Sequence, residues 1–459
     1  MNKRFDAIII GSGQSGPSLA ARFVKEGMRV AVIERKHFGG TCVNTGCVPT
    51  KTLVASAYVA HMARRAAEYG VDVGGAVKVD IKRVMARKNA IVEKSRANIA
   101  QWMDGLKDSR VCRGHARFTS PRTVAVNGET LEADKIVINT GGRALIPAMA
   151  GLDRVPYLTN SSIMELDELP EHLVVLGGSY IGLEFAQAFR RFGARVTIVE
   201  MADRLIARED EDVSDAVREI LEGEGVEVRL GAKCLSVEKD GDGFAMTMDC
   251  ATGAPRVRGS HLLLAVGRRP NTDDLGLEKA GVALDSKGYI AVDEQCRANV
   301  EGVWAIGDVN GRGAFTHTSY NDFEIVAANL FDKDPRRISD RIPCYGLFID
   351  PPLGRVGLTE REVRAKGVKA LSAKRLMTAV GRARERGETL GFMKVVVDAQ
   401  SNKILGAAML GIAGDEAVHA FLDVMAAGAP YTAISRTVHI HPTVAEYLPT
   451  LLGDLKPLA

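Results

Sequence analysis

The 459-residue sequence lacks a long hydrophobic segment and any strong excess of charge. No stretch approaches the roughly 18 apolar residues that a membrane-spanning helix needs. The 60 basic and 57 acidic side chains leave a formal net charge of +3, so no strong overall field favours nucleic acid. Aromatic residues make up only 5% of the chain, and no nucleic-acid-binding motif occurs. We therefore expect no membrane and no nucleic acid among its partners.

A secretory signal is also missing, because the apolar run near Met1 is short and leads directly into a glycine turn. We therefore expect a cytoplasmic protein, in a compartment where thiols stay reduced. Cysteine is scarce, with seven residues, and this odd number does not predict a structural disulfide framework. A close cysteine pair in this compartment is more typical of catalysis, redox sensing or metal binding.

Residues 5–34 predict a dinucleotide-binding unit made of a strand, a glycine turn, a helix and a second strand. Gly11 permits the tight turn, Gly13 lets backbone amides approach a pyrophosphate, and Gly16 lets the helix pack closely on the strand. Glu34 ends the second strand, where a carboxylate can bind ribose hydroxyls.

The same pattern returns at residues 173–200. The first glycine and the terminal acid are 23 positions apart in both units, from Gly11 to Glu34 and from Gly177 to Glu200. Two units at matching spacing predict two dinucleotide sites in one chain.

The remaining segments are less regular, and the length suggests about three domains. Residues 55–105 predict polar helix, and residues 111–142 predict short strands separated by Gly and Pro turns. Residues 302–311 predict a buried strand that ends at Asp308, and an α+β segment begins near Arg341.

Cys42 and Cys47 lie five positions apart, just beyond the first unit. Zinc ligation would need two further ligands at finger-like spacing, and the sequence has no second pair. Buried structural thiols are another possibility, but Gly46 and Pro49 indicate an unusual backbone. A helix that begins near Cys47 would favour its thiolate through the helix dipole, with Lys51 on the same face. The residues favour a redox pair beside a cofactor.

Several motifs follow one another in a characteristic order along the whole chain. They are the first nucleotide-binding unit, the segment 39–51 ("GGTCVNTGCVPTK"), the second unit, "VGRRPNT", "AIGDV" and "HIHPTVAE". In this order they resemble the class I pyridine nucleotide-disulfide oxidoreductases, which include dihydrolipoamide dehydrogenase, glutathione reductase and mercuric reductase. The resemblance implies an α/β fold with two Rossmann-like dinucleotide-binding domains, for FAD and NAD(P), and a C-terminal α+β dimerisation domain. The implied boundaries are 1–150 and 271–340 for the FAD-binding domain, 151–270 for the NAD(P)-binding domain and 341–459 for the dimerisation domain.

The resemblance also implies a path for electrons. Reduced nicotinamide nucleotide at the second unit passes hydride to the FAD held by the first, and the flavin opens a Cys42–Cys47 disulfide. Cys47 corresponds to the flavin-facing thiolate and Cys42 to the thiol that attacks the substrate. Lys51 corresponds to the family lysine near the flavin, and Glu184 to its carboxylate partner. The alternative for Glu184 is a first-turn acid stabilised by the helix dipole.

Further roles follow from the same resemblance. Tyr180 resembles an aromatic gate over the nicotinamide, with packing as its alternative role, and Asp308 resembles the acid that binds the FAD ribitol. His441 and Glu446 resemble a base and its orienting carboxylate, which the family supplies from the partner subunit, so an active homodimer is implied. His439 is then either structural or a support for the residues that act. The candidate cofactor-binding residues are Gly11, Ser12, Gly13, Gly16, Glu34, Thr41, Lys51, His115, Thr140, Gly141, Gly177, Gly178, Tyr180, Gly182, Glu200, Gly267 and Asp308. No metal ligand is expected.

Glu200 favours NADH as the reduced nucleotide. A carboxylate at this position accepts hydrogen bonds from a free ribose diol and repels a 2′-phosphate. Arg204 and Arg208 follow closely and keep NADPH open as the alternative.

The electron acceptor is less well defined by the sequence. Mercuric reductases carry a cysteine pair near the C-terminus, whereas the last cysteine here is Cys344, so mercury reduction by the usual route is disfavoured. The chain instead resembles a mercuric-reductase-like bacterial branch without that pair, and the first hypothesis is reduction of a small-molecule disulfide or a metal ion. Dihydrolipoamide dehydrogenase of a 2-oxoacid dehydrogenase complex is the second, although Thr45 and Pro352-Leu353 depart from its pattern. A flavin-based redox sensor is the alternative of another class.

Overall fold

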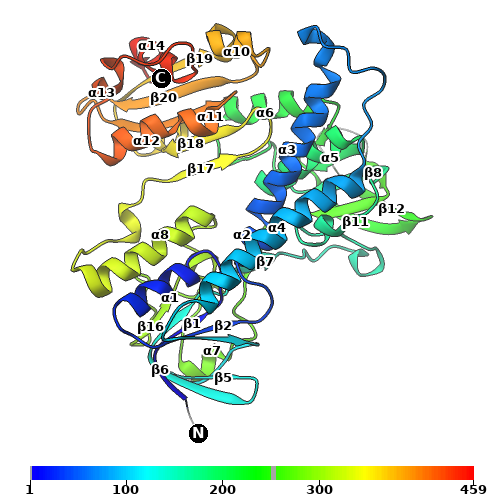
Figure 1. The fold of residues 1–459 in the computed structure, drawn as a ribbon. Helices are drawn as coiled ribbons and strands as arrows, with labels where there is room; N and C mark the ends of the chain where they lie inside the picture. Colours follow the sequence, from blue (N-terminus) through cyan, green and yellow to red (C-terminus); the bar gives the residue numbers. More distant parts are fainter. Residues whose placement is uncertain (1–2, 250–254, 459) are drawn as a thin grey trace.

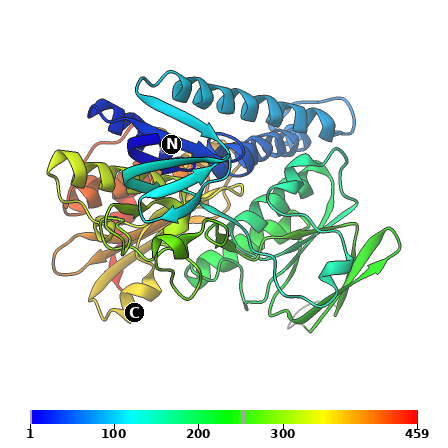
Figure 2. The same ribbon diagram turned by 90° about the horizontal axis from the view of Figure 1, so that it is seen from below.

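The computed structural model describes residues 3–249 and 255–458, which form three units built on different sheets (Figures 1 and 2). The first unit contains a seven-stranded sheet of order β3-β2-β1-β6-β5-β4, with β16 also paired to β6. Strands β3, β2, β1, β6 and β16 are parallel, whereas β5 and β4 are antiparallel. The strands are β1 (Lys3–Ile10), β2 (Val30–Glu34), β3 (Ser109–Arg113), β4 (Arg117–Ser120), β5 (Thr123–Val126), β6 (Glu129–Ile138) and β16 (Val303–Ala305). Residues 7–10 of β1 are fully apolar and buried, as expected for a parallel strand covered on both faces.

Two helices of the first unit, α3 and α4, occupy the region that the sequence predicts as a polar helical segment over 55–105. The structure interrupts that segment after α3, because Gly70, Gly74 and Gly75 adopt positive φ values of 73°, 67° and 105°. The helices are α1 (Gly16–Lys25), α2 (Gly40–Thr45), α3 (Cys47–Arg64), α4 (Ile81–Asp104), α7 (Leu277–Ala280) and α8 (Thr316–Ala327). The long α4 extends from the first unit towards the second (Figures 1 and 2). Its Met85 packs in the core of the second unit and its Met103 in that of the first.

The second unit repeats the strand–turn–helix–strand pattern in a parallel sheet of order β10-β9-β8-β14, as predicted. An antiparallel sheet of order β11-β12-β13 lies beside it (Figure 1). The elements are β8 (His172–Leu176), α5 (Tyr180–Phe192), β9 (Arg195–Val199), α6 (Glu211–Gly223), β10 (Glu227–Arg229), β11 (Lys233–Asp240), β12 (Gly243–Asp249), β13 (Arg256–Gly259) and β14 (His261–Leu264). A short pair, β7 (Gly142–Ala144) and β15 (Arg268–Pro270), joins the segments that enter and leave this unit.

The C-terminal unit is the α+β segment that the sequence predicts from about residue 341. Its six-stranded sheet is antiparallel, with order β17-β18-β21-β20-β19-β22. The strands are β17 (Cys344–Leu347), β18 (Leu353–Gly357), β19 (Ala370–Leu376), β20 (Phe392–Asp398), β21 (Ile404–Leu410) and β22 (Lys456–Pro457). The helices are α9 (Glu360–Ala365), α10 (Gly381–Glu385), α11 (Gly414–Ala417), α12 (His419–Ala426), α13 (Thr432–Ser435) and α14 (Leu448–Gly453).

The strand predicted over 302–311 is shorter than expected. β16 covers only three residues, and Asp308 lies in a 3-10 turn, η4 (Gly307–Asn310). The turn begins at Gly307, whose φ of 73° ends the extended backbone. The domain boundaries at 150, 270 and 340 remain predictions. Within residues 3–249 and 255–458, no helix is long and apolar enough to cross a membrane.

Candidate active site

The first nucleotide turn joins β1 to α1 with a backbone that requires glycine. Gly11 has a φ of 107°, and a Cβ there would lie 2.3 Å from the carbonyl oxygen of Asn139. A Cβ on Gly16 would lie 2.4 Å from the carbonyl oxygen of Gly11. A Cβ on Gly13 would come no closer than 3.5 Å to the Asn139 side chain, so the protein itself does not require glycine there. Glycine at an uncrowded position of a turn that opens a helix fits the close approach of a pyrophosphate.

Glu34 lies beside this turn, at the end of β2. Its Oε2 accepts hydrogen bonds from the Ser12 backbone nitrogen at 3.0 Å and from Ser12 Oγ at 2.7 Å. Its Oε1 accepts one from the Lys36 nitrogen at 2.8 Å. These contacts hold the carboxylate at the turn, where the sequence predicts a ribose-binding acid.

The neighbouring segments bring other predicted residues to the same side of the first unit. His115 Nε2 lies 3.0 Å from the carbonyl oxygen of Asp274. Thr140 Oγ1 donates a hydrogen bond to the carbonyl oxygen of Asn271 at 2.9 Å, and Gly141 has a φ of 64°. A cavity of about 630 Å³ is lined by Arg35, Lys36, His115, Arg117, Arg143, Asp273 and Asp274. The positive side chains along it fit a phosphate-bearing cofactor.

The second nucleotide turn also has a backbone that requires glycine. Gly177 has a φ of 114°, and a Cβ there would lie 2.5 Å from the carbonyl oxygen of Ala265. A Cβ on Gly182 would lie 2.1 Å from the carbonyl oxygen of Gly177. Glu200 Oε2 accepts a hydrogen bond from the Gly178 nitrogen at 2.5 Å, as Glu34 does at the first turn. The residues present therefore fit a second dinucleotide.

The cysteine pair lies on two consecutive helices that meet at Gly46. α2 ends before Gly46 and α3 begins at Cys47, which confirms the predicted helix start. A Cβ on Gly46 would lie 2.9 Å from the Thr41 carbonyl oxygen, so the connection is tight. Asn44 Nδ2 bonds the carbonyl oxygens of Phe38 and Gly40 at 2.9 and 2.8 Å and holds α2 in place.

Both cysteines are free thiols, and they interact with each other. The hydrogen bond that Cys42 donates is the largest effect on Cys47 and lowers its pKa from 9.0 to about 6, although burial opposes it. Thr316 and the charge of Lys51 lower this pKa further, and Glu184 raises it. The same hydrogen bond, with burial, raises the pKa of Cys42. These shifts favour a thiolate at Cys47 and a protonated thiol at Cys42.

Lys51 forms the expected ion pair with Glu184 across the two nucleotide units. Its Nζ lies 2.6 Å from Glu184 Oε2 and 2.8 Å from Oε1, and the Glu184 side chain is 6% exposed. The Phe348 nitrogen also donates to Glu184 Oε1 at 3.0 Å, and Lys51 Nζ lies 4.5 Å from the centre of the Phe348 ring. This pair places a cation one helical turn from the Cys47 thiolate.

Two residues near Cys47 were not predicted from the sequence. Thr316 Oγ1 lies 3.1 Å from Cys47 Sγ, although 269 positions separate them in the chain. The adjacent Phe315 contacts Tyr180 edge-on, with ring centres 6.1 Å apart, and stacks on Tyr345 at 5.6 Å. Tyr180 is therefore part of an aromatic cluster, and burial raises its pKa to about 12.

Asp308 lies in η4 and pairs with Arg268, which belongs to the "VGRRPNT" motif. Arg268 Nε lies 3.5 Å from Asp308 Oδ2, and its Nη2 contacts Thr41 Oγ1 at 3.4 Å. Gly267, with a φ of 130°, precedes it. Burial raises the pKa of Asp308, and Arg268 opposes this shift. Arg268 thus connects three predicted cofactor residues, and its place in the motif was the available sequence signal.

His441 forms the predicted pair with Glu446 near the end of the chain. Its Nδ1 lies 2.8 Å from Glu446 Oε2, and its side chain is 80% exposed. Within one chain, no hydrogen bond joins His441 to Cys42 or Cys47. His439 Nδ1 lies 3.0 Å from the nearby Thr437 carbonyl oxygen. No cluster of three or more His, Cys, Asp or Glu residues suited to a metal ion occurs within 3–249 and 255–458.

Comparisons with known proteins agree with this geometry. A family model described as pyridine nucleotide-disulphide oxidoreductase matches residues 5–322, and the dimerisation-domain model of the same family matches residues 344–452. The probable pyridine nucleotide-disulfide oxidoreductase RclA of Escherichia coli is 35% identical over 99% of this chain and 100% of its own length. A solved Cu(II) complex of RclA, described as an HOCl-induced flavoprotein disulfide reductase, has a TM-score of 0.89 at 34% identity and covers 99% of both chains.

Two other relatives carry different activities in their names. The dihydrolipoyl dehydrogenase of Thermus scotoductus is 33% identical over 97% of this chain and 96% of its own length. The mercuric reductase of Streptomyces lividans is 34% identical over 97% and 94%. Relatives in this family use FAD and NAD(P)H, and the dimerisation domain indicates a homodimer. The chain belongs to the pyridine nucleotide-disulphide oxidoreductase family and is a flavoprotein disulfide oxidoreductase.

Proposed function

We propose that this protein is an NAD(P)H-dependent reductase in which Cys42 and Cys47 pass electrons to a small disulfide or a metal ion. The observation that carries this proposal is the placement of Cys42 and Cys47 on two helices that meet at Gly46, next to the Lys51–Glu184 ion pair. The lowered pKa of Cys47 and the raised pKa of Cys42 favour a thiolate beside a protonated thiol. Such a pair is ready to lose two electrons, because closing the disulfide needs only one proton to leave Cys42. The proposal places this reaction in the cytoplasm.

The two nucleotide turns would hold the cofactors on either side of the Lys51–Glu184 pair. FAD would be bound by the first turn together with Thr41, Lys51, His115, Thr140 and Asp308. The reduced nucleotide would be bound by the second turn together with Tyr180, Glu200 and Gly267. Bound FAD would supply hydride acceptance from that nucleotide and two-electron reduction of the Cys42–Cys47 disulfide. Lys51 would stabilise negative charge at this boundary, since its cation already lowers the pKa of Cys47.

Cys42 would act on the acceptor, and this step needs a base. The raised pKa of Cys42 means that its proton must be removed before its sulfur can attack. We assign this role to His441 of the partner subunit, oriented by Glu446, because in its own chain the His441 side chain points outward and is largely exposed. With a disulfide acceptor, Cys42 sulfur bonds one acceptor sulfur and releases the other, and Cys47 then displaces the first to close the Cys42–Cys47 bond.

A metal ion is the alternative acceptor within the same proposal. Two Cu(II) ions would each take one electron from the pair, giving two Cu(I), the closed disulfide and the proton released by Cys42. The Cu(II) complex of RclA supports this acceptor class, and soft thiolates suit copper. NADH is the proposed donor, since Glu200 stands at the second turn.

The test is steady-state oxidation of NADH and of NADPH with an acceptor panel of glutathione disulfide, lipoamide, Cu(II) and Hg(II). We expect turnover with Cu(II) or a disulfide, a preference for NADH, and loss of turnover in Cys42→Ser while NADH still bleaches the flavin. Turnover confined to dioxygen would contradict the proposal and favour a redox sensor. Unchanged acceptor turnover in Cys42→Ser would contradict the role of the pair.

Dihydrolipoyl dehydrogenase is the second candidate function. The Thermus scotoductus relative and the His441–Glu446 pair favour it. In that case turnover with lipoamide would be faster than turnover with every other acceptor of the panel, and dihydrolipoamide would reduce NAD⁺.

A further inference from the structure

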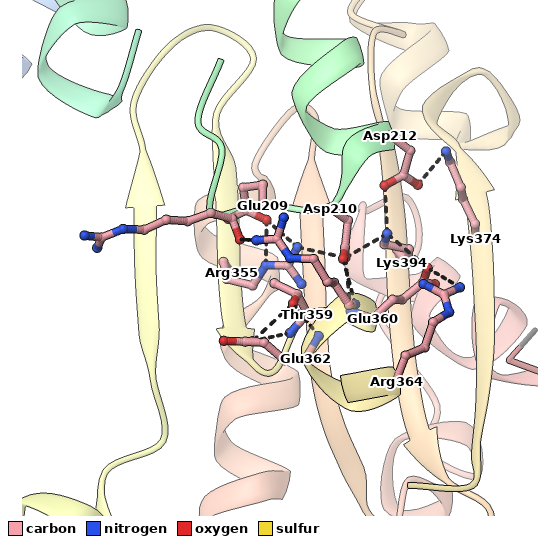
Figure 3. A network of polar contacts seen from close by, with 12 residues as sticks. Glu209, Asp210, Asp212, Arg355, Thr359, Glu360, Glu362, Arg364, Lys374 and Lys394 are labelled. Carbon is pink, nitrogen blue, oxygen red and sulfur yellow. Dashed lines mark hydrogen bonds and ion pairs between the residues drawn. The ribbon is translucent and has the colours of Figure 1, made fainter. Parts of the chain in front are cut away.

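A buried ion network joins the second unit to the C-terminal sheet (Figure 3). Arg355 on β18 is 1% exposed, and its guanidinium bonds Glu209, which is 0% exposed, through Nε at 3.0 Å and through Nη2. Lys394 on β20 adds a second buried cation, whose Nζ lies 3.0 Å from Asp210 Oδ2 and 2.8 Å from Asp212 Oδ1. The C-terminal unit thus binds the segment that leads into α6 through buried ion pairs.

Glu209 extends this network to the aromatic cluster of the candidate active site. Tyr345 donates its hydroxyl hydrogen to Glu209 Oε1 at 2.6 Å. The Tyr345 ring meets Tyr180 edge-on, with centres 5.5 Å apart. Both carboxylate oxygens of Glu209 are therefore used, one for Arg355 and one for the ring that contacts Tyr180.

The segment before Glu209 also closes the second nucleotide turn. The Ile206 nitrogen donates to the Gly178 carbonyl oxygen at 2.9 Å, and a Cβ on Gly178 would lie 2.6 Å from the Leu205 side chain. Ile206 has a φ of 39°, a conformation that a β-branched residue adopts only when its surroundings enforce it. Arg361 contributes to this enforcement, since its Nη2 bonds the carbonyl oxygens of residues 207 and 208 at 3.1 and 2.9 Å.

We propose that Arg355 is a positioning residue for the reduced nucleotide, acting through Glu209 on both sides of its site. One side is the Gly178 turn, held by residues 205–206, and the other is Tyr180, held by Tyr345. The inference rests on the proposed function only in taking the second unit as the site of NAD(P)H. Arg355 itself is too deeply buried to touch the nucleotide, so its effect is on the shape of the empty site.

The physical argument is one of pre-organisation. A site whose competent shape is populated only part of the time binds its ligand more weakly by that fraction. Removing the Glu209–Arg355 pair frees a strained segment and an aromatic ring together. Binding of the nucleotide should then weaken, whereas electron transfer from nucleotide that is already bound should change little.

The experiment compares three variants of the flavin-loaded protein. Arg355→Met/Glu209→Leu replaces the buried pair with apolar side chains, which avoids an unpaired buried charge. Tyr345→Phe removes only the hydroxyl that reaches Glu209. Lys394→Met is the matched control, because it deletes a buried cation of the same network that contacts neither Glu209 nor Tyr345. The measurements are the Kd of NAD⁺ and NADP⁺, the KM for NADH, kcat and the melting temperature.

We expect the double variant to raise Kd and KM together by about 10-fold, and Tyr345→Phe by about 3-fold, with kcat nearly unchanged. Lys394→Met should lower the melting temperature and leave Kd unchanged. If the double variant folds and its Kd equals that of the wild type, the proposal is overturned. If the double variant does not fold, an unchanged Kd in Tyr345→Phe overturns the proposal instead. A wild-type protein that binds nucleotide but reduces no acceptor would refute the proposed function alone, because the Kd comparison does not depend on turnover.

Discussion

The two nucleotide turns are alike in backbone but differ in what supports them. In each, the first glycine has a positive φ beside a carbonyl oxygen, of Asn139 for Gly11 and of Ala265 for Gly177. In each, a strand-ending acid accepts a hydrogen bond from the turn. The first turn is covered by Gly39, whose nitrogen donates to the Ser12 carbonyl oxygen at 3.0 Å, and this segment belongs to the same unit as the turn. The second is covered by residues 205–206, and the nearby Glu209 accepts a hydrogen bond from Arg355 of the C-terminal unit.

This difference indicates that similar motifs need not give equally independent sites. The first site depends on β1, β2 and β6, which are neighbouring strands of one sheet and whose buried residues belong to two apolar clusters. The second site shares an apolar core with the C-terminal unit, in which Leu205 and Ile206 cluster with Leu347 and Leu353. Changes in the C-terminal unit should therefore reach the second site more readily than the first.

The strongest way to break the comparison is to add a methyl group to each first glycine. Gly11→Ala and Gly177→Ala each force a residue into a left-handed backbone against a carbonyl oxygen, at a cost of about 3 kcal/mol or more. We expect Gly11→Ala to lose bound flavin, and Gly177→Ala to keep flavin that NADH no longer bleaches. Flavin absorbance per protein and anaerobic bleaching measure both.

Gly223→Ala in α6 is the matched control, because its Cβ would meet nothing within 4 Å. It should bind flavin and be bleached normally. Loss of flavin in Gly177→Ala would show that the two sites are not separable in this way.

The next largest effect is on the pKa of Cys47 within the cysteine pair. Cys42→Ala removes the hydrogen bond that contributes most to the low pKa of Cys47, whereas Cys42→Ser keeps a donor. A pKa of about 6 keeps Cys47 ionised near neutral pH, and a return towards 9.0 would leave it mostly protonated there. Alkylation of Cys47 near neutral pH should then be about 10- to 100-fold slower in Cys42→Ala than in Cys42→Ser. The pH profile of iodoacetamide labelling measures this, and equal midpoints would contradict it.

A smaller effect should follow from Thr316, which lies far from both turns in the sequence. Thr316→Val removes the hydroxyl that contacts Cys47 Sγ, and the pKa of Cys47 should rise by less than in Cys42→Ala. Thr316→Ser should restore the wild-type midpoint of the labelling profile. A rise in Thr316→Ser as large as in Thr316→Val would instead indicate a packing effect of the methyl group.

The sequence could predict the parts of this site that depend on local pattern. The glycine turns, the terminal acids and the helix start at Cys47 all follow from residues within about 25 positions of each other. The ion pair between Lys51 and Glu184 came from the family resemblance, since periodicity identifies buried faces but does not identify distant partners.

The missed side-chain contacts join distant segments. Glu209 and Arg355 are 146 positions apart, and charged residues in a sequence are ordinarily read as surface residues. Only the packing of β18 against the segment before α6 makes them a buried pair. The break between α3 and α4 was also missed, although the glycines at 70, 74 and 75 were a local signal.

The smallest expected effect on the pKa of Cys47 concerns the Lys51–Glu184 pair, a direct ionic contact between the two nucleotide units. Lys51→Met leaves the Glu184 carboxylate buried with the Phe348 nitrogen as its remaining donor among the described residues, so stability should fall by about 1–3 kcal/mol. The pKa of Cys47 should rise, because a cation that lowers it is lost while the carboxylate that raises it remains. Lys51→Met/Glu184→Gln removes both charges, so it should recover most of the stability and shift the pKa of Cys47 less than the single variant. Melting temperature and the labelling midpoint measure the two effects. If the double variant shifted the pKa more than Lys51→Met, the charges at this boundary would not act on Cys47 as opposed neighbours.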